Sequence, residues 1–138
     1  LMRVVLDTSV LVSALISPGG WPDRLYQAWR VGHFELISSR EQMEEFRRVT
    51  RYPRLRPLVS AAAAGSMVNE INRLAVLVTK LPRVDRSPDP FDNFILAMAE
   101  AGKADYLVAR DKAGLLGLKN HGTTPIITVQ GFLGILDV

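Results

Sequence analysis

Short apolar runs alternate along the chain with segments whose apolar residues recur at helical spacing. Short runs of apolar and β-branched residues are typical of buried strands, and they predict strands over residues 3–7, 34–37, 106–109 and 125–129. Between and after these runs, the 3.6-residue spacing of apolar positions predicts helices. The expected helices cover residues 10–16, 22–32, 39–52, 60–78, 91–101 and 131–136.

Several residues mark where the predicted helices begin and end. Thr8 or Ser9 is expected to cap the first helix, and Ser38 or Ser39 the third. Gly32 and Gly102 are expected to end two others. Strands alternating with helices favour an α/β fold with a mainly parallel sheet. The 138 residues show no linker, repeat or low-complexity tract, so we expect one domain over residues 1–138.

Composition narrows the class of protein. Hydrophobic residues make up 48% and charged residues 22%, which is typical of a globular chain. The absence of cysteine excludes disulfides and thiolate metal sites, and it fits a cytoplasmic protein. No apolar run approaches the roughly 18 residues needed to span a bilayer, so no membrane association is expected.

Two aspartates come directly after predicted strands. Asp7 ends the first strand, and Asp111 follows the strand over residues 106–109 by two positions. An aspartate there is commonly just a helix cap. In open α/β sheets, however, functional sites lie beyond the carboxyl ends of the strands. If the two strands are neighbours, their carboxylates lie at the same edge of the sheet.

Two further acids are placed by helical geometry. Asp92 stands at the start of the helix over residues 91–101, where Asp89 competes for the capping role and leaves Asp92 free to face a site. On the third helix, the apolar stripe leaves Glu45 at the border of the buried face and Glu44 toward solvent. A carboxylate at the core boundary needs a partner, and a metal ion would serve.

Clustered carboxylates suit hard divalent cations. Oxygen ligands favour Mg²⁺ or Mn²⁺ over Zn²⁺, and such ions activate water and orient phosphodiesters. The sequence shows no nucleophile elbow, phosphate-binding glycine loop or His/Cys metal spacing. The acidic cluster is therefore the candidate catalytic centre.

Basic residues supply a candidate substrate contact. The net charge is only +3, but arginines concentrate between Arg40 and Arg56. A solvated helix face explains such a run equally well, whereas arginine's planar donor fork suits phosphate. Arg48 and Arg51, three residues apart, are expected to share one helix face near Glu45 and to contact substrate phosphates.

The quoted residues, in this order, resemble the PIN-domain nuclease family, and most of all the VapC-like toxins of bacterial toxin–antitoxin pairs. The matching stretches are residues 4–15, 45–49, 92–99 and 104–111, and residues 125–136 resemble the family's last strand and helix. The similarity thus extends over nearly the whole chain.

The resemblance implies a three-layer α/β/α fold and a Mg²⁺- or Mn²⁺-dependent RNA endonuclease. It implies that Asp7, Glu45, Asp92 and Asp111 bind metal and carry catalysis, assisted by Ser9. It further implies RNA as the substrate, frequent homodimerisation and inhibition by a cognate antitoxin protein.

Two positions depart from the family pattern. Ala109 stands where many relatives have Thr or Ser, and Asn93 where some have another acid, so metal affinity is expected to be lower. One alternative is a non-catalytic PIN-fold module that binds RNA or a protein partner. Another is a phosphatase or receiver-type domain with Asp7 as phospho-acceptor, but Asp7-Thr8-Ser9 lacks the second nearby aspartate of such sites.

Overall fold

A mostly parallel sheet of six strands forms the centre of the computed structural model, which describes residues 1–138. The strand order is β3-β2-β1-β4-β6-β5, and only β5 runs antiparallel to its neighbour. The strands are β1 (Arg3–Leu6), β2 (Glu35–Ser38), β3 (Val76–Leu77), β4 (Tyr106–Val108), β5 (Asn120–His121) and β6 (Thr124–Ile127). The predicted α/β fold with a mainly parallel sheet is confirmed.

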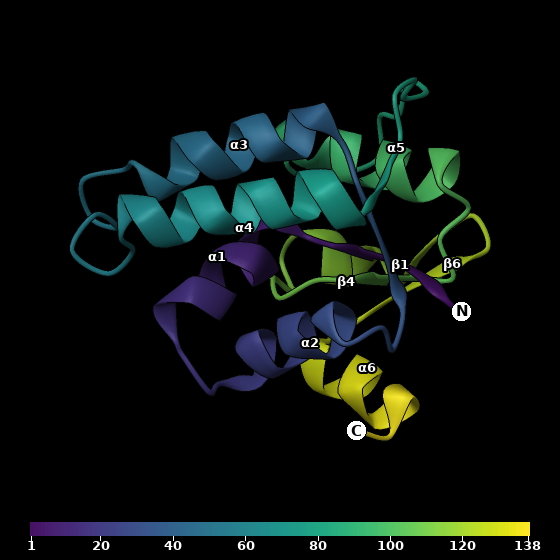
Figure 1. Ribbon diagram of the computed structural model, residues 1–138. Coiled ribbons are helices and arrows are strands. Elements are labelled where there is room, and N and C mark those ends of the chain that lie inside the picture. The colour runs from purple at the N-terminus through teal and green to yellow at the C-terminus, as the bar shows by residue number, and fades with distance from the viewer.

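Six α-helices flank the sheet: α1 (Thr8–Ile16), α2 (Trp21–Arg30), α3 (Arg40–Thr50), α4 (Ala61–Leu74), α5 (Asn93–Ala101) and α6 (Val129–Leu136). Two 3₁₀ turns, η1 (Pro90–Asp92) and η2 (Leu115–Leu118), complete the elements. Figure 1 shows α5 on one side of β1 and β4, with α2 and α6 on the other. The three-layer α/β/α arrangement is therefore also confirmed.

Side chains of the central strands enter two separate cores. In β1, Val4 and Leu6 belong to the larger core, which α1, α2, α3, α4 and α6 also line, whereas Val5 belongs to the smaller core beneath α5. The same alternation separates Leu107 from Val108 in β4. Successive side chains of a strand point to opposite faces, so a sheet covered on both sides requires the continuous apolar runs seen in the sequence.

The structure corrects several predicted boundaries. The fourth helix was expected to reach Val78, but it ends at Leu74, and Ala75 is extended (φ −79°, ψ 160°). The chain then forms β3, which pairs with the end of β2. The predicted helix over residues 91–101 begins as the 3₁₀ turn η1 and becomes α-helical at Asn93.

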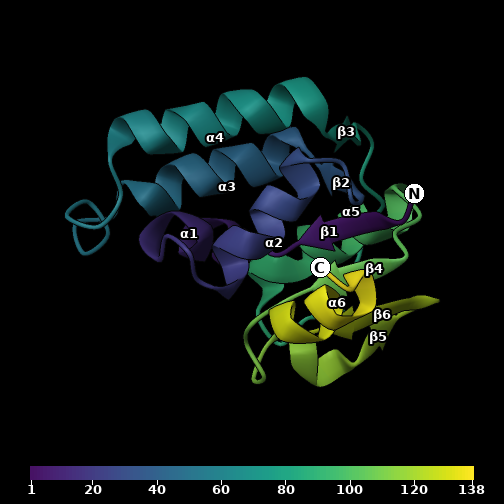
Figure 2. The same ribbon diagram turned by 60° about the horizontal axis from the view of Figure 1, so that its bottom comes forward.

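At the C-terminal end, Thr128 caps α6, so this helix begins at Val129 rather than at residue 131, and β6 ends before it. The short strands β3 and β5, which were not predicted, form the two edges of the sheet (Figure 2). The cap of α1 was assigned to the wrong residue. Asp7 occupies the N-cap position, although its side chain makes no capping hydrogen bond.

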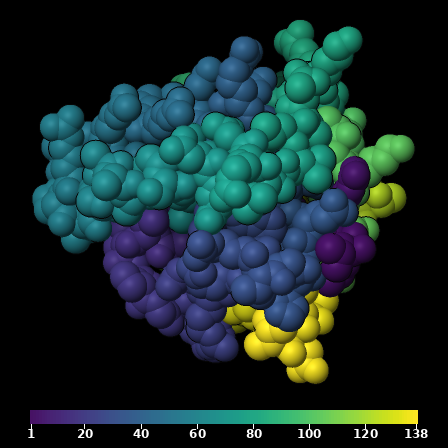
Figure 3. Space-filling view, in the orientation of Figure 1, coloured from purple at the N-terminus to yellow at the C-terminus, as the bar shows by residue number.

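The helix α4 crosses one face of the molecule as a continuous ridge (Figure 3). It packs beside α3, which also contacts α1. No helix combines the length and the apolar character that crossing a membrane requires.

Candidate active site

The parallel strands β1 and β4 bring Asp7 and Asp111 to the same edge of the sheet. Leu6 is paired with Val108, and the backbone N–H of Asp7 donates to the Val108 carbonyl (2.9 Å). Asp7 is therefore the first residue beyond its strand, and Asp111 follows three residues after Val108. The two strands are neighbours, which is the condition under which the sequence placed both carboxylates at one edge of the sheet.

The side chain of Gln42 anchors α3 to this edge. Gln42 is fully buried, and its Nε2 donates to the carbonyl of Leu6 (2.7 Å). Its Oε1 accepts from the Ser38 hydroxyl (2.7 Å), while the Ser39 hydroxyl caps α3 by accepting from the Gln42 backbone N–H (3.1 Å). These contacts hold the first turn of α3 against the end of β1. Glu45 lies one turn further on, where the helix passes the sheet edge.

The two adjacent glutamates differ as predicted. The side chain of Glu45 is 15% exposed and that of Glu44 is 65% exposed. Glu44 pairs with Arg40 on the solvent side of α3. Glu45 therefore faces the site and Glu44 does not.

The connection before α5 is held so that Asp92 is left free. Asp89 caps the 3₁₀ turn by accepting from the Phe91 N–H (3.0 Å), and Asp92 makes no capping hydrogen bond. The Asn93 Oδ1 accepts from the backbone N–H groups of Arg86 (3.0 Å) and Ser87 (2.8 Å). Asp89 thus takes the capping role, as the sequence predicted, and Asn93 holds the loop in place.

Four acids from four different segments line one pocket of about 350 Å³, which we call the acidic pocket. Besides Asp7, Glu45, Asp92 and Asp111, its lining includes Ser9, Arg54 and Arg110. The Ser9 hydroxyl donates to the Asp7 carboxylate (3.3 Å). The acids that were selected from the sequence are therefore brought together.

The acids of this pocket perturb one another electrostatically. Burial, reinforced by the negative charges of Asp92 and Glu45, raises the pKa of Asp7 to about 7. Burial also raises the pKa of Asp92, to about 6, and the charges of Asp89, Glu45 and Asp111 add to that effect. Both shifts reflect the free-energy penalty of holding negative charge in a partly desolvated cluster.

The chemistry of these side chains fits a hard divalent cation, because every acidic donor is an oxygen. Their placement is more open than a finished metal site. No three of the acidic or histidine side chains converge closely enough to enclose an ion. The pocket therefore holds a suitable set of donors, and a bound ion would require some of these side chains to move closer together.

Comparison with known protein families bears on this pocket directly. A family model described as "PIN domain" matches residues 3–113, which include all four acids. The chain belongs to the PIN-domain family. No curated protein matches the sequence significantly. PIN domains are generally nucleases, so this chain is a nuclease-like module, and its family indicates interaction with nucleic acid.

The candidate arginines of this PIN domain separate into two groups. The Arg48 guanidinium lies 3.9 Å from the Glu45 carboxylate, next to the acidic pocket. Arg51 lines a different pocket, between α3 and α4. The sequence placed the two on one helix face, but the structure does not bring them to the same pocket.

Two residues at the site, Arg110 and Gln42, were not singled out from the sequence. Arg110 lines the acidic pocket beside Arg54, a member of the predicted arginine run, and hydrogen-bonds to the Ser13 hydroxyl. Gln42, which positions α3, had a recognisable signal: it precedes the apolar Met43 and lies one turn before Phe46, on the buried side of the helix. A polar residue on a buried face needs hydrogen-bond partners, and here they include the end of the strand that carries Asp7.

The departure at residue 109 is also visible in the structure. Ala109 is fully buried in the smaller core and continues the β4 ladder by donating to the Ile127 carbonyl (3.0 Å). Its methyl group provides no oxygen. Alanine therefore replaces the Thr or Ser of many relatives without disturbing the strand, but it removes their hydroxyl group.

Proposed function

We propose that this PIN domain is a metal-dependent endoribonuclease. The observation that carries the proposal is the acidic pocket itself, which gathers four carboxylates from the end of β1, α3, η1 and the loop after β4. Burial, with the charges of neighbouring acids added to it, raises the pKa values of Asp7 and Asp92 there. Raised carboxylate pKa values within a cleft are a feature of functional sites. A cation would offset the repulsion that the protein alone does not.

In this proposal, Asp7, Glu45, Asp92 and Asp111 hold Mg²⁺ or Mn²⁺. When bound, the ion would activate water and neutralise charge on the phosphodiester. Ser9 orients Asp7 through its hydrogen bond. Arg48, together with the pocket residues Arg54 and Arg110, offers positive charge to the phosphates beside the cleaved bond.

The test compares two adjacent positions on α3 in an RNA cleavage assay with Mg²⁺, Mn²⁺ or EDTA. We expect Glu45→Gln to lower metal-dependent cleavage by about 100-fold or more, because it removes a ligand from a small set. Glu44→Gln, which makes the same chemical change on the solvent side of the helix, is expected to keep the wild-type rate. Equal losses in the two variants would contradict the assignment.

A non-catalytic RNA- or partner-binding module is the second candidate. It is favoured by the open placement of the acids, of which no three converge on an ion site. The same assay decides between the two functions. RNA binding without cleavage in either metal, by a preparation whose folding is verified, would establish the binding module.

We further propose that the protein is the toxin of a toxin–antitoxin pair in the cytoplasm and acts as a homodimer inhibited by its antitoxin. The support is the resemblance of residues 4–15 and 92–99 to VapC-like toxins. A small antitoxin reading frame beside the gene, with co-purification of the two products, tests this role. Growth arrest on expression of the wild type but not of Glu45→Gln would support it.

We also propose that residues 1–138 act as one PIN domain, although the family match ends at residue 113. The support is the pairing of β6 with β4 in the same sheet and the contacts of α6 with α2. The segment beyond the match therefore completes both the sheet and the larger core.

A further inference from the structure

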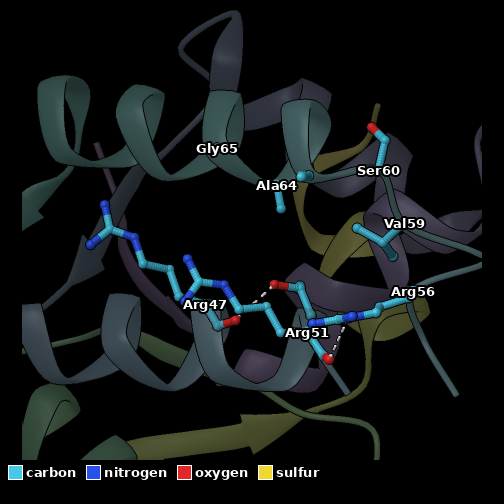
Figure 4. Close-up of a pocket in the computed structure, with 9 residues that line it drawn as sticks. Arg47, Arg51, Arg56, Val59, Ser60, Ala64 and Gly65 are labelled. Atoms are coloured by element: carbon cyan, nitrogen blue, oxygen red, sulfur yellow. Dashed lines mark hydrogen bonds between the residues drawn. The ribbon is translucent and has the colours of Figure 1, made fainter. Parts of the chain in front are cut away.

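A second pocket, of about 450 Å³, lies between α3 and the start of α4 and outside the acidic pocket. Three arginine side chains line it, from α3 and the connection that follows (Figure 4). We call it the arginine pocket. Its lining is Arg47, Thr50, Arg51, Arg56, Val59, Ser60, Ala61, Ala64 and Gly65.

The arginines of this pocket have no acidic partners. The ion pairs of the protein involve other residues, so Arg47, Arg51 and Arg56 leave their charges uncompensated. The only side-chain hydrogen bond among the three guanidinium groups runs from the Arg56 Nε to the Arg51 carbonyl (3.0 Å). Most of their N–H donors thus remain free for a ligand. Three like charges gathered in one hollow favour an anion.

Small residues of α4 keep the hollow open. Ala61, Ala64 and Gly65 face the arginines, and a Cβ placed on Gly65 would meet no atom within 4 Å. The first turn of α4 is at the same side, with Ser60 capping the helix through the Ala63 N–H (3.0 Å). The positive end of a 14-residue helix adds to the field of the guanidinium groups.

We infer that the arginine pocket binds phosphate groups of the RNA backbone, as a second contact separate from the acidic pocket. Guanidinium groups bind phosphate oxygens through paired N–H donors. The segment that follows Glu45 lines both pockets: Val49, Arg54 and Leu55 line the acidic one, whereas Arg51 and Arg56 line the other. The choice of RNA as the ligand rests on the proposed function, because an RNA strand bound at the acidic pocket would bring further backbone phosphates to this part of the surface.

The arginine pocket lies on the side of α3 away from the acidic pocket, so it can hold a different part of the same RNA strand. A strand that enters the acidic pocket is held there near the bond to be cleaved, while the arginine pocket holds a phosphate further along the same strand. Such backbone contacts fix the register of the strand without reading its bases. The pocket therefore contributes affinity rather than sequence preference.

The experiment measures binding of a labelled single-stranded RNA in EDTA, so that cleavage plays no part. Arg47→Gln combined with Arg51→Gln is expected to weaken binding at low salt at least tenfold. The slope of log K against log salt should fall by about 1.4, since each lost single-strand phosphate contact contributes about 0.7. The control is Arg73→Gln combined with Arg83→Gln, which removes the same charge at exposed positions outside both pockets.

A second pair of variants keeps every arginine. Gly65→Glu places a carboxylate inside the hollow and is expected to weaken RNA binding several-fold, while the helix tolerates the change because glutamate is the better helix former. Gly134→Glu is its matched control, since Gly134 also lies in a helix, α6, with no atom within 4 Å of an added Cβ. This control should bind RNA like the wild type.

Each outcome decides the inference. Loss of RNA affinity in the two pocket variants alone supports the inference. An equal loss in the control variants would overturn it, because net charge alone would then explain the effect. Unchanged RNA binding in the pocket variants would overturn it. Binding of polyglutamate is measured in the same way. If the pocket variants keep RNA binding but lose polyglutamate binding, the pocket instead binds an acidic protein partner. Since binding is measured without metal, these results stand apart from whether Glu45→Gln abolishes cleavage.

Discussion

The buried carboxylate of Asp7 gives a sharp prediction about stability. Its pKa is raised from 3.8 to about 7 in the folded protein, chiefly by burial and then by the charge of Asp92. The difference between these two pKa values sets an upper limit of about 4 kcal/mol on the contribution of Asp7 to stability. Side-chain relaxation and water entry lower this figure, and we expect about 1–3 kcal/mol.

The sign of the effect follows from proton linkage. Between pH 4 and pH 7 the folded state holds a proton on Asp7 that the unfolded state has released, so the free energy of unfolding falls as pH rises. The contribution of Asp7 to stability is therefore fully present below pH 4 and lost above pH 7. Asp7→Asn removes this dependence, since asparagine does not ionise.

Urea unfolding of the metal-free protein from pH 4 to pH 8 measures the difference between wild type and variant. We expect the two to be nearly equal at pH 4 and Asp7→Asn to be more stable by about 1–3 kcal/mol at pH 8. Asp137→Asn is the control, because this exposed residue has a left-handed backbone (φ 57°) that asparagine tolerates. A variant at residue 7 that is clearly less stable at pH 8 would show Asp7 to be structural and refute the reasoning.

Thermal unfolding with and without Mn²⁺ tests the metal site. If the acidic pocket binds Mn²⁺, the ion should raise the Tm of the wild type by mass action, and more at pH 8 than at pH 5 because protons compete at Asp7 and Asp92. The Tm of Asp7→Asn should respond less. An equal response at both pH values would place the bound ion elsewhere.

Two further predictions concern how the site is held. Gln42→Met keeps the side-chain volume but leaves the Leu6 carbonyl and the Ser38 hydroxyl without their partner. We therefore expect the free energy of unfolding in urea to fall by about 1–3 kcal/mol and RNA cleavage to be slower. Unchanged stability would show that these hydrogen bonds are dispensable. Gly102→Ala would bring a Cβ within 2.7 Å of the Ile37 side chain and should lower stability by about 1–3 kcal/mol, measured in the same way, and a neutral result would mean that Ile37 readjusts freely.

Sequence patterns predicted the central strands well because each is buried on both faces. The runs around Val5 and Leu107 are apolar throughout, as a doubly covered parallel strand requires. The edge strands β3 and β5 are two residues long and carry no such signal. Helical spacing extended α4 to Val78, but Leu74 is half exposed, and the segment after it gains more by pairing with β2.

The four acids were predictable because strand ends and helix phase determine their positions. Asp7 and Asp111 follow from adjacent parallel strands, and Glu45 from its angle relative to Met43 and Phe46. The arginines were harder to place, since a long side chain follows its local partners as much as its helix angle. Arg48 turns toward Glu45, whereas Arg51 caps the end of α3 and lines the hollow beside α4.

The double role of α3 has a consequence for how this gene can vary. The helix presents Glu45 to one pocket and, about 200° further round, Arg47 to the other, and the bonds of Gln42 set the angle of both. A one-residue insertion or deletion after Gln42 would rotate the remainder by about 100° and remove both surfaces at once. In a library of variants, this stretch should accept many exchanges at its exposed positions and almost no change of length.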